Sequence, residues 1–123
     1  MILVDSSVWV DHLRSGDPVL TTLLNAGQVM GHPFVIGEIA LGSLSQRGAI
    51  LAAMHDLPIA MQASDSEVQA FIESQPLFGL GIGYIDAHLL ASTRLTPGAS
   101  LWTRDKRLHS IASRLGLAAT PQH

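Results

Sequence analysis

The chain of 123 residues contains no cysteine, few aromatic residues and no long apolar run. The absence of cysteine excludes a disulfide framework and any zinc site built on thiolates, and it is compatible with a reducing cytoplasm. No stretch approaches the roughly 18 apolar residues that a membrane-spanning helix requires, and no basic, hydrophobic leader precedes Asp5. We therefore expect a cytoplasmic protein that is neither exported nor held in a membrane.

Charged residues are also scarce, at 14% of the chain against 47% apolar residues, so aliphatic side chains should fill a substantial interior. This length suits one domain, which we expect to span residues 1–123 and to need no disulfide or structural metal. No internal repeat, linker or low-complexity segment divides the chain.

The net charge of -3 is distributed unevenly along the chain. Residues 1–93 carry nine acids and two bases, whereas residues 94–123 carry one acid and five bases, which are Arg94, Arg104, Lys106, Arg107 and Arg114. An acidic body with a basic end suits a site that gathers cations and still guides a polyanion past them. Charge alone favours the simpler alternative that the basic segment is a solvated helix face.

Strand and helix patterns alternate along the sequence. Residues 1–4 are apolar without alternation, which is typical of a strand covered on both faces in a parallel sheet. Further short strands are expected at 28–30, 57–60, 99–102 and 117–120. Helices are expected at 7–14, 18–27, 33–44, 47–56 and 84–94, after the capping box that begins at Ser64, and after Asp105. The pattern predicts an α/β domain around a central parallel sheet.

Two aspartates follow expected strands directly. Asp5 ends the first strand, and Asp105 follows the strand at 99–102. In open α/β sheets the ligand crevice lies outside the carboxyl ends of the strands, so both carboxylates are expected at the same rim. Each aspartate, taken alone, is more simply explained as the cap of the helix that follows it.

Two further acids occupy unusual helical positions. The residues three and four positions away are apolar or glycine in both cases: Phe34, Val35, Leu41 and Gly42 around Glu38, and Ile82, Gly83, Leu89 and Leu90 around Asp86. Both carboxylates are therefore expected on inner helix faces, where an unpaired charge is very costly. For Glu38 the alternatives are a position at the edge of the apolar stripe or a pair with an arginine.

The four acids Asp5, Glu38, Asp86 and Asp105 can converge at one rim of the sheet. Such a cluster repels itself unless hard divalent cations occupy it, and Mg²⁺ or Mn²⁺ prefers oxygen ligands. A carboxylate-held Mg²⁺ activates water and stabilises the charge on a phosphodiester during in-line displacement. Metal-dependent nucleic-acid hydrolysis is therefore the leading functional hypothesis.

Two other features carry less information. His88 lies two residues from Asp86, which on a helix directs it away from the same site, so we expect it at the surface or in contact with a partner. Gly79, Gly81 and Gly83 resemble a phosphate-binding loop only weakly, because neither a strand before them nor the spacing of a dinucleotide fingerprint is present.

Four motifs together resemble the PIN domain, and within it the VapC ribonuclease toxins of toxin–antitoxin pairs: I-L-V-D-S-S-V-W at 2–9, I-G-E-I-A at 36–40, G-Y-I-D-A-H-L-L at 83–90 and L-W-T-R-D-K at 101–106. The resemblance covers nearly the whole chain and implies a three-layer α/β/α sandwich with a central parallel sheet. It implies that the four acids bind Mg²⁺, with the Ser7 and Thr103 hydroxyls near the metal. It also implies a homodimer, an RNA substrate and a VapB-type antitoxin that blocks the site.

Three rival interpretations come from other protein classes. A response-regulator receiver domain needs adjacent acids after its first strand, where this chain has Asp5 and Ser6. A phosphatase of the D-x-D type needs an acid at position 7, which is Ser7. A catalytically silent PIN-fold module that binds RNA or protein keeps every acid in place, and RNA cleavage separates it from the enzyme.

Overall fold

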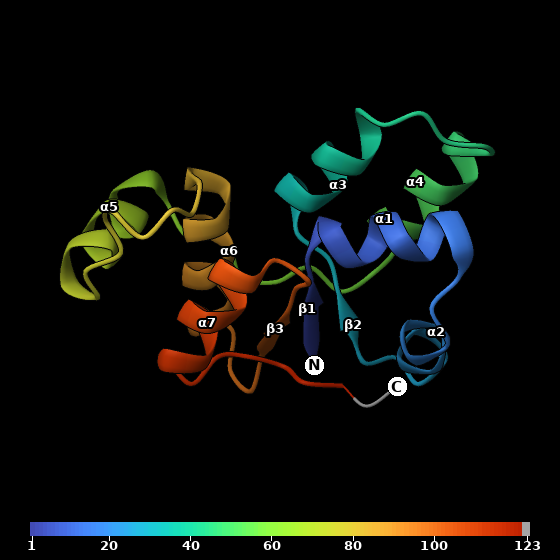
Figure 1. Ribbon diagram of the computed structural model, residues 1–123. Helices are drawn as coiled ribbons and strands as arrows, with labels where there is room; N and C mark the ends of the chain where they lie inside the picture. Colours follow the sequence, from blue (N-terminus) through green and yellow to red (C-terminus); the bar gives the residue numbers. More distant parts are fainter. Residues whose placement is uncertain (122–123) are drawn as a thin grey trace.

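The computed structural model describes residues 1–121 and places a small parallel sheet between two groups of helices (Figure 1). The expectation of one domain over residues 1–123 includes Gln122 and His123, which lie outside the described residues. In chain order the elements of residues 1–121 are β1 (Ile2–Val4), α1 (Ser6–Ser15), α2 (Pro18–Asn25), β2 (Val29–Met30), α3 (Pro33–Ala40), α4 (Arg47–His55), α5 (Asp65–Ser74), α6 (Tyr84–Leu95), β3 (Ser100–Trp102) and α7 (Lys106–Arg114).

The sheet has the order β2-β1-β3, with β1 in the centre and parallel to both neighbours. Leu3 and Val4 are fully buried there, as the unbroken apolar pattern predicts. The prediction of strands at 57–60 and 117–120 is wrong in extent. Each segment forms one isolated bridge instead, Ile59 with Gly31 and Ala118 with Leu101. Proline explains the short outer strands, because residues 58 and 121 have no N–H with which to extend a ladder.

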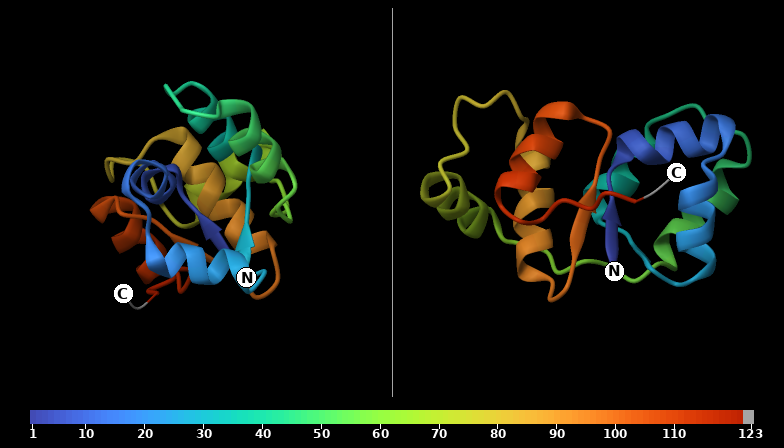
Figure 2. Two further views of the ribbon diagram at one scale, coloured as in Figure 1. Left: turned by 90° about the vertical axis from the view of Figure 1, so that its right-hand side faces the viewer. Right: turned by 60° about the horizontal axis from the view of Figure 1, so that its bottom comes forward.

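Helices cover the sheet from two sides. Figures 1 and 2 show α1 to α4 on one side and α5 to α7 on the other. The largest cluster of buried apolar side chains joins both groups to the sheet and includes Leu20, Val35, Leu90 and Leu108. The expected three-layer α/β/α architecture is therefore confirmed. Within residues 1–121, no helix combines the length and the apolar character that crossing a membrane requires.

The capping signals in the sequence mark the helix starts correctly. Asp17 accepts hydrogen bonds from the N–H groups of Val19 and Leu20, and Ser64 with Glu67 forms the expected capping box. The end of α3 differs from the expectation, because this helix stops at Ala40 rather than continuing to residue 44. Gly42 and the serines that follow it are poor helix formers, and Leu41 at the end is 91% exposed.

Candidate active site

Asp5 is the most firmly held acid of the predicted site. Val4 on β1 lies opposite Trp102 on β3, so both strands deliver their next residues to one rim of the sheet. Asp5 is only 6% exposed, and its Oδ2 accepts hydrogen bonds from the Ser7 hydroxyl at 2.7 Å and the Thr103 hydroxyl at 2.8 Å. Although Asp5 occupies the N-cap position of α1, its side chain makes no capping hydrogen bond. The capping alternative therefore does not explain this aspartate.

The two hydroxyls are themselves oriented by the backbone of the β3–α7 connection. Ser7 Oγ accepts from the Arg104 N–H at 3.0 Å, and Thr103 Oγ1 accepts from the Asp105 N–H at 3.1 Å. Each hydroxyl proton is thereby directed to Asp5 Oδ2. Within residues 1–121 no hydrogen bond reaches the second oxygen of Asp5, Oδ1. One carboxylate oxygen is thus fixed, and the other stays available to a ligand.

Glu38 lies on α3, which packs against α1. The expectation of an inner face is wrong for this residue, because its side chain is exposed and so are its helical neighbours Phe34 and Leu41. The protein around the carboxylate nevertheless removes part of its water, and this desolvation raises the pKa of Glu38. Repulsion from Asp5 and Asp86 raises the pKa further, while a hydrogen bond with Ser6 opposes the shift.

Asp86 is half-buried in the first turn of α6, where its Oδ2 accepts a hydrogen bond from the Gly83 N–H at 3.3 Å. Burial raises the pKa of Asp86, and the hydrogen bond from Gly83 counteracts it. Repulsion from Asp5 and from Asp105 then raises the pKa again. Asp86 therefore interacts electrostatically with both Asp5, after β1, and Asp105, before α7.

Asp105 is exposed and acts as the cap of α7, accepting a hydrogen bond from the Leu108 N–H at 2.9 Å. The capping role expected for this residue is confirmed, and its charge still acts on Asp86. We call Asp5, Glu38, Asp86 and Asp105 the acidic rim. Each of the four repels at least one other member, and among the described residues none of them forms an ion pair.

The donor set of the acidic rim fits a hard divalent cation in its chemistry, since it offers carboxylate and hydroxyl oxygens only. In the conformation of residues 1–121, no three histidine or acidic side chains lie close enough together to hold a metal ion. Glu38 and Asp105 are the exposed members, so they have room to move inward, whereas Asp5 is already fixed.

Comparison with known proteins supplies the family. No family model matches the chain. Two curated relatives do, both called Ribonuclease VapC32, from the CDC 1551 and H37Rv strains of Mycobacterium tuberculosis. Each is 44% identical over 118 residues, which cover 96% of this chain and 95% of the relative.

The chain belongs to the VapC family. The resemblance found in the four motifs is thereby confirmed, and the α/β architecture agrees with a PIN-like fold. In this VapC family member, Asp5 follows β1 and Asp105 lies between β3 and α7, whereas Glu38 and Asp86 lie on α3 and α6.

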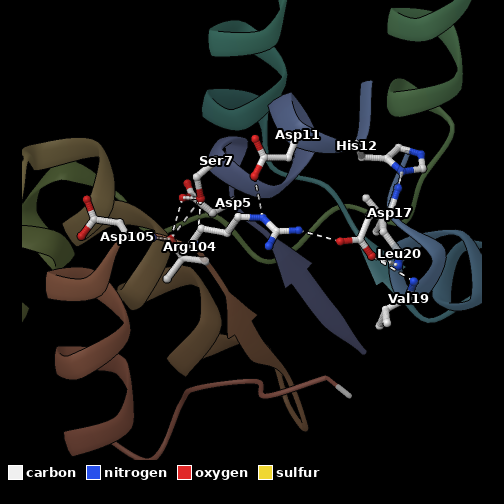
Figure 3. A network of polar contacts seen from close by, with 10 residues as sticks. Asp5, Ser7, Asp11, His12, Asp17, Val19, Leu20, Arg104 and Asp105 are labelled. Atoms are coloured by element: carbon white, nitrogen blue, oxygen red, sulfur yellow. Dashed lines mark hydrogen bonds and ion pairs between the residues drawn. The ribbon is translucent and has the colours of Figure 1, made fainter. Parts of the chain in front are cut away.

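The sequence does not reveal a second polar network beside the rim of this VapC family member. Arg104 forms an ion pair through Nε with Asp11 at 2.9 Å and a second one through Nη2 with Asp17 (Figure 3). Its guanidinium also lies over the Trp102 ring, 5.9 Å from the centroid. Arg104 thus ties the β3–α7 connection to α1 and to the cap of α2. Its partners lie more than 80 residues away in the sequence, so no local signal indicates them.

The histidines of this VapC family member differ from expectation. His88 is buried rather than at the surface, and its Nε2 lies 3.2 Å from Asp65 Oδ1 at the start of α5. A second histidine, His32, is also buried. The sequence gives no sign of this, because His32 simply precedes the proline that begins α3. Its Nδ1 accepts from the Phe34 N–H, so Nε2 carries the proton and donates to the Ser92 hydroxyl at 3.1 Å. Burial, and then repulsion from His88, lowers the pKa of His32 to about 4.

Proposed function

We propose that the chain is an endoribonuclease that uses Mg²⁺ or Mn²⁺, bound by Asp5, Glu38, Asp86 and Asp105, and that it is the toxin of a toxin–antitoxin pair. The observation that carries this proposal is the set of mutually repelling carboxylates without a basic partner among the described residues. Four such charges at one rim call for a cation, because repulsion and desolvation otherwise disfavour their charged forms. The name of the M. tuberculosis relatives supports RNA as the substrate.

The side chains have distinct roles in this proposal. Bound Mg²⁺ supplies an activated water and stabilises the charge on the phosphodiester during displacement. Asp5 anchors the site, because Ser7 and Thr103 fix one of its oxygens and leave Oδ1 for the cation. Asp86, held by the Gly83 N–H, presents a second carboxylate from α6. Glu38 and Asp105 complete the ligand set from the exposed side.

The partners follow from the family and from the surface. We propose that a VapB-type antitoxin binds the chain and blocks the acidic rim. We also propose that the chain is located in the cytoplasm, where its RNA substrate is. A groove of about 350 Å³ between α1, α3 and α4 is consistent with this partner. It is lined by Leu13, Ile39, Leu44 and Ile50 and also by Glu38, so a segment bound there would contact the acidic rim. We also propose a homodimer, for which exposed apolar side chains such as Phe78 and Met61 offer contact surface.

The test is RNA cleavage by the purified chain, freed of any partner, with Mg²⁺ or Mn²⁺ and with excess EDTA. We expect cleavage that stops in EDTA and in Asp86→Asn. Undiminished cleavage in EDTA would contradict the metal mechanism and indicate a contaminating nuclease. RNA binding without any metal-dependent cleavage would favour the catalytically silent PIN-fold module instead.

A further inference from the structure

One face of α7 forms a shallow groove that the proposed function does not use. The groove has a volume of about 330 Å³ and is lined by Leu80, Lys106, Arg107, Ser110, Ile111 and Arg114. The polar members recur at helical spacing along one side of α7, and no acid lines the groove. We call these six residues the basic groove.

We propose that the basic groove binds the phosphate backbone of single-stranded RNA that extends from the acidic rim. This inference rests on the proposed function, since it assumes an RNA substrate. Lysine and arginine that contact backbone phosphates release condensed cations and so supply affinity without reading the base sequence. The groove is then a substrate track beside the site of cleavage.

The cations of the groove are available, in contrast to Arg104. Lys106, Arg107 and Arg114 form no ion pair within residues 1–121, although the chain as a whole carries more acids than bases. Arg114 donates to the Gln75 carbonyl oxygen at 3.0 Å, which orients the guanidinium without neutralising it. Arg114 is therefore oriented by a hydrogen bond, and no ion pair within residues 1–121 cancels any of the three charges, as a polyanion site requires.

The glycines at 79 and 81 explain how the second wall of the groove approaches the helix. Both have a positive φ, of 73° and 81°, which side chains other than glycine rarely adopt. A Cβ atom on Gly81 would lie 2.6 Å from Arg107 Nη1, whereas a Cβ on Gly79 would meet nothing within 4 Å. A side chain at residue 81 would therefore displace the Arg107 guanidinium from its present position in the groove.

The groove and the acidic rim are adjacent along the chain at the start of α7. Asp105 caps α7, and Lys106 is the first residue of that helix. From Lys106 to Arg114 the helix axis extends about 12 Å at 1.5 Å per residue, which several successive phosphates can follow. A strand in the groove would thus deliver its next phosphodiester to the rim, where the repulsion of the acids permits approach only beside a bound cation.

The experiment measures binding of a fluorescent oligouridine in EDTA, so that cleavage does not interfere. The test variant replaces Lys106, Arg107 and Arg114 with glutamine. A matched control replaces Arg14, Arg47 and Arg94 with glutamine, which changes the net charge equally outside the groove. Each lost phosphate contact lowers the slope of log K against log salt by about 0.7 on single strands. We expect the test variant to lose about 2 from the slope and roughly 100-fold in affinity at 0.1 M salt.

A second pair of variants tests position rather than charge. Gly81→Ala and Gly79→Ala impose similar backbone strain, but only Gly81→Ala displaces Arg107. We expect both to lose stability alike and only Gly81→Ala to weaken oligouridine binding, by roughly 5-fold for one phosphate contact. The Gly79→Ala protein reports whether any loss of binding is merely a consequence of strain.

The outcomes separate this inference from the proposed function. If the groove variant keeps the wild-type salt slope while the wild type cleaves RNA with Mg²⁺, the groove is not an RNA site and the nuclease proposal stands. If the variant binds oligouridine normally but no longer binds a cognate protein partner, the groove is a protein interface and the inference is overturned. If the wild type never cleaves RNA, the nuclease proposal fails, and the salt slopes still decide the groove.

Discussion

The acidic rim and the basic groove are neighbouring regions of opposite charge, and they differ in how the chain builds them. Four separate segments bring the acids of the rim together, and burial and repulsion raise the pKa values of Glu38 and Asp86. One face of α7 supplies all the cations of the groove, and these remain exposed. Both regions keep like charges without ion pairs among the described residues, and we propose a cation as the ligand of the rim and RNA phosphates as the ligand of the groove.

The rim should respond most strongly to the loss of a single charge. Asp5→Asn and Asp86→Asn keep the shape of each side chain but remove a proposed metal ligand, so RNA cleavage should fall by roughly 10²- to 10³-fold. Glu73→Gln on the exposed face of α5 is the matched control and should cleave normally. Initial cleavage rates at saturating Mg²⁺ measure the effect. Full activity in Asp86→Asn would remove this residue from the site.

The pH dependence of folding stability should distinguish the acids of the rim from the buried, neutral His32. The unfolded state binds more protons at His32 than the folded state between pH 6.5 and about 4, so this histidine lowers stability as the pH falls through that window. The effect is at most about 3 kcal/mol. The raised pKa values of Glu38 and Asp86 act in the opposite direction, because protonation removes charges that desolvation and then repulsion disfavour in the folded state.

His32→Asn separates the contribution of His32 to the pH dependence of stability from that of Glu38 and Asp86. Asparagine at this position keeps an acceptor for the Phe34 N–H but does not titrate. Urea unfolding of the metal-free variant from pH 7 to pH 5 should show stability that holds or rises, whereas the wild type should lose stability. An identical pH dependence in both proteins would show that the protonation of His32, beside His88 and its partner Asp65, does not govern acid unfolding.

Arg104 sharpens the contrast between structural and substrate-binding cations. Arg104→Gln removes the ion pair with the buried Asp17 Oδ2 but leaves the capping hydrogen bonds of Asp17 in place, so it should lower the free energy of unfolding by about 1–3 kcal/mol. The salt slope of oligouridine binding should hardly change, because this guanidinium is already paired. Lys106→Gln should do the reverse, with normal stability and a reduced slope. Urea unfolding and binding titrations of both variants measure the two effects, and a large slope change in Arg104→Gln would contradict the assignment.

The sequence predicts the framework of this molecule better than its surface. The unbroken apolar pattern identifies β1, and short-range capping signals locate α2, α5 and α7, because these features depend on neighbouring residues. Glu38 shows the limit of such reasoning. Its helical neighbours predict an inner face, but Phe34 and Leu41 prove to be exposed, so the apolar character of a helix face does not by itself indicate burial.

Contacts between distant segments are the other limit. The ion pairs of Arg104 and the burial of His88 against Asp65 depend on how α1, α2, α5 and α6 pack, and no local pattern encodes them. The four acids are found in advance only as a set, since Asp5 and Asp105, each taken alone, are more simply explained as helix caps. The hydroxyls of Ser7 and Thr103 enter through the family resemblance, and their hydrogen bonds to Asp5 require the pairing of β1 with β3.

Thermal melting with and without Mg²⁺ tests the acidic rim most directly. In EDTA, Glu38→Gln and Asp86→Asn should melt higher than the wild type, because each removes repulsion without changing shape. Mg²⁺ at about 100 times its Kd should raise the wild-type Tm by roughly 10 °C through mass action, and raise the variants less. Asp5→Asn, Asp105→Asn and the control Glu73→Gln complete the series. If all of these proteins melt alike and ignore Mg²⁺, the four carboxylates do not form a metal site.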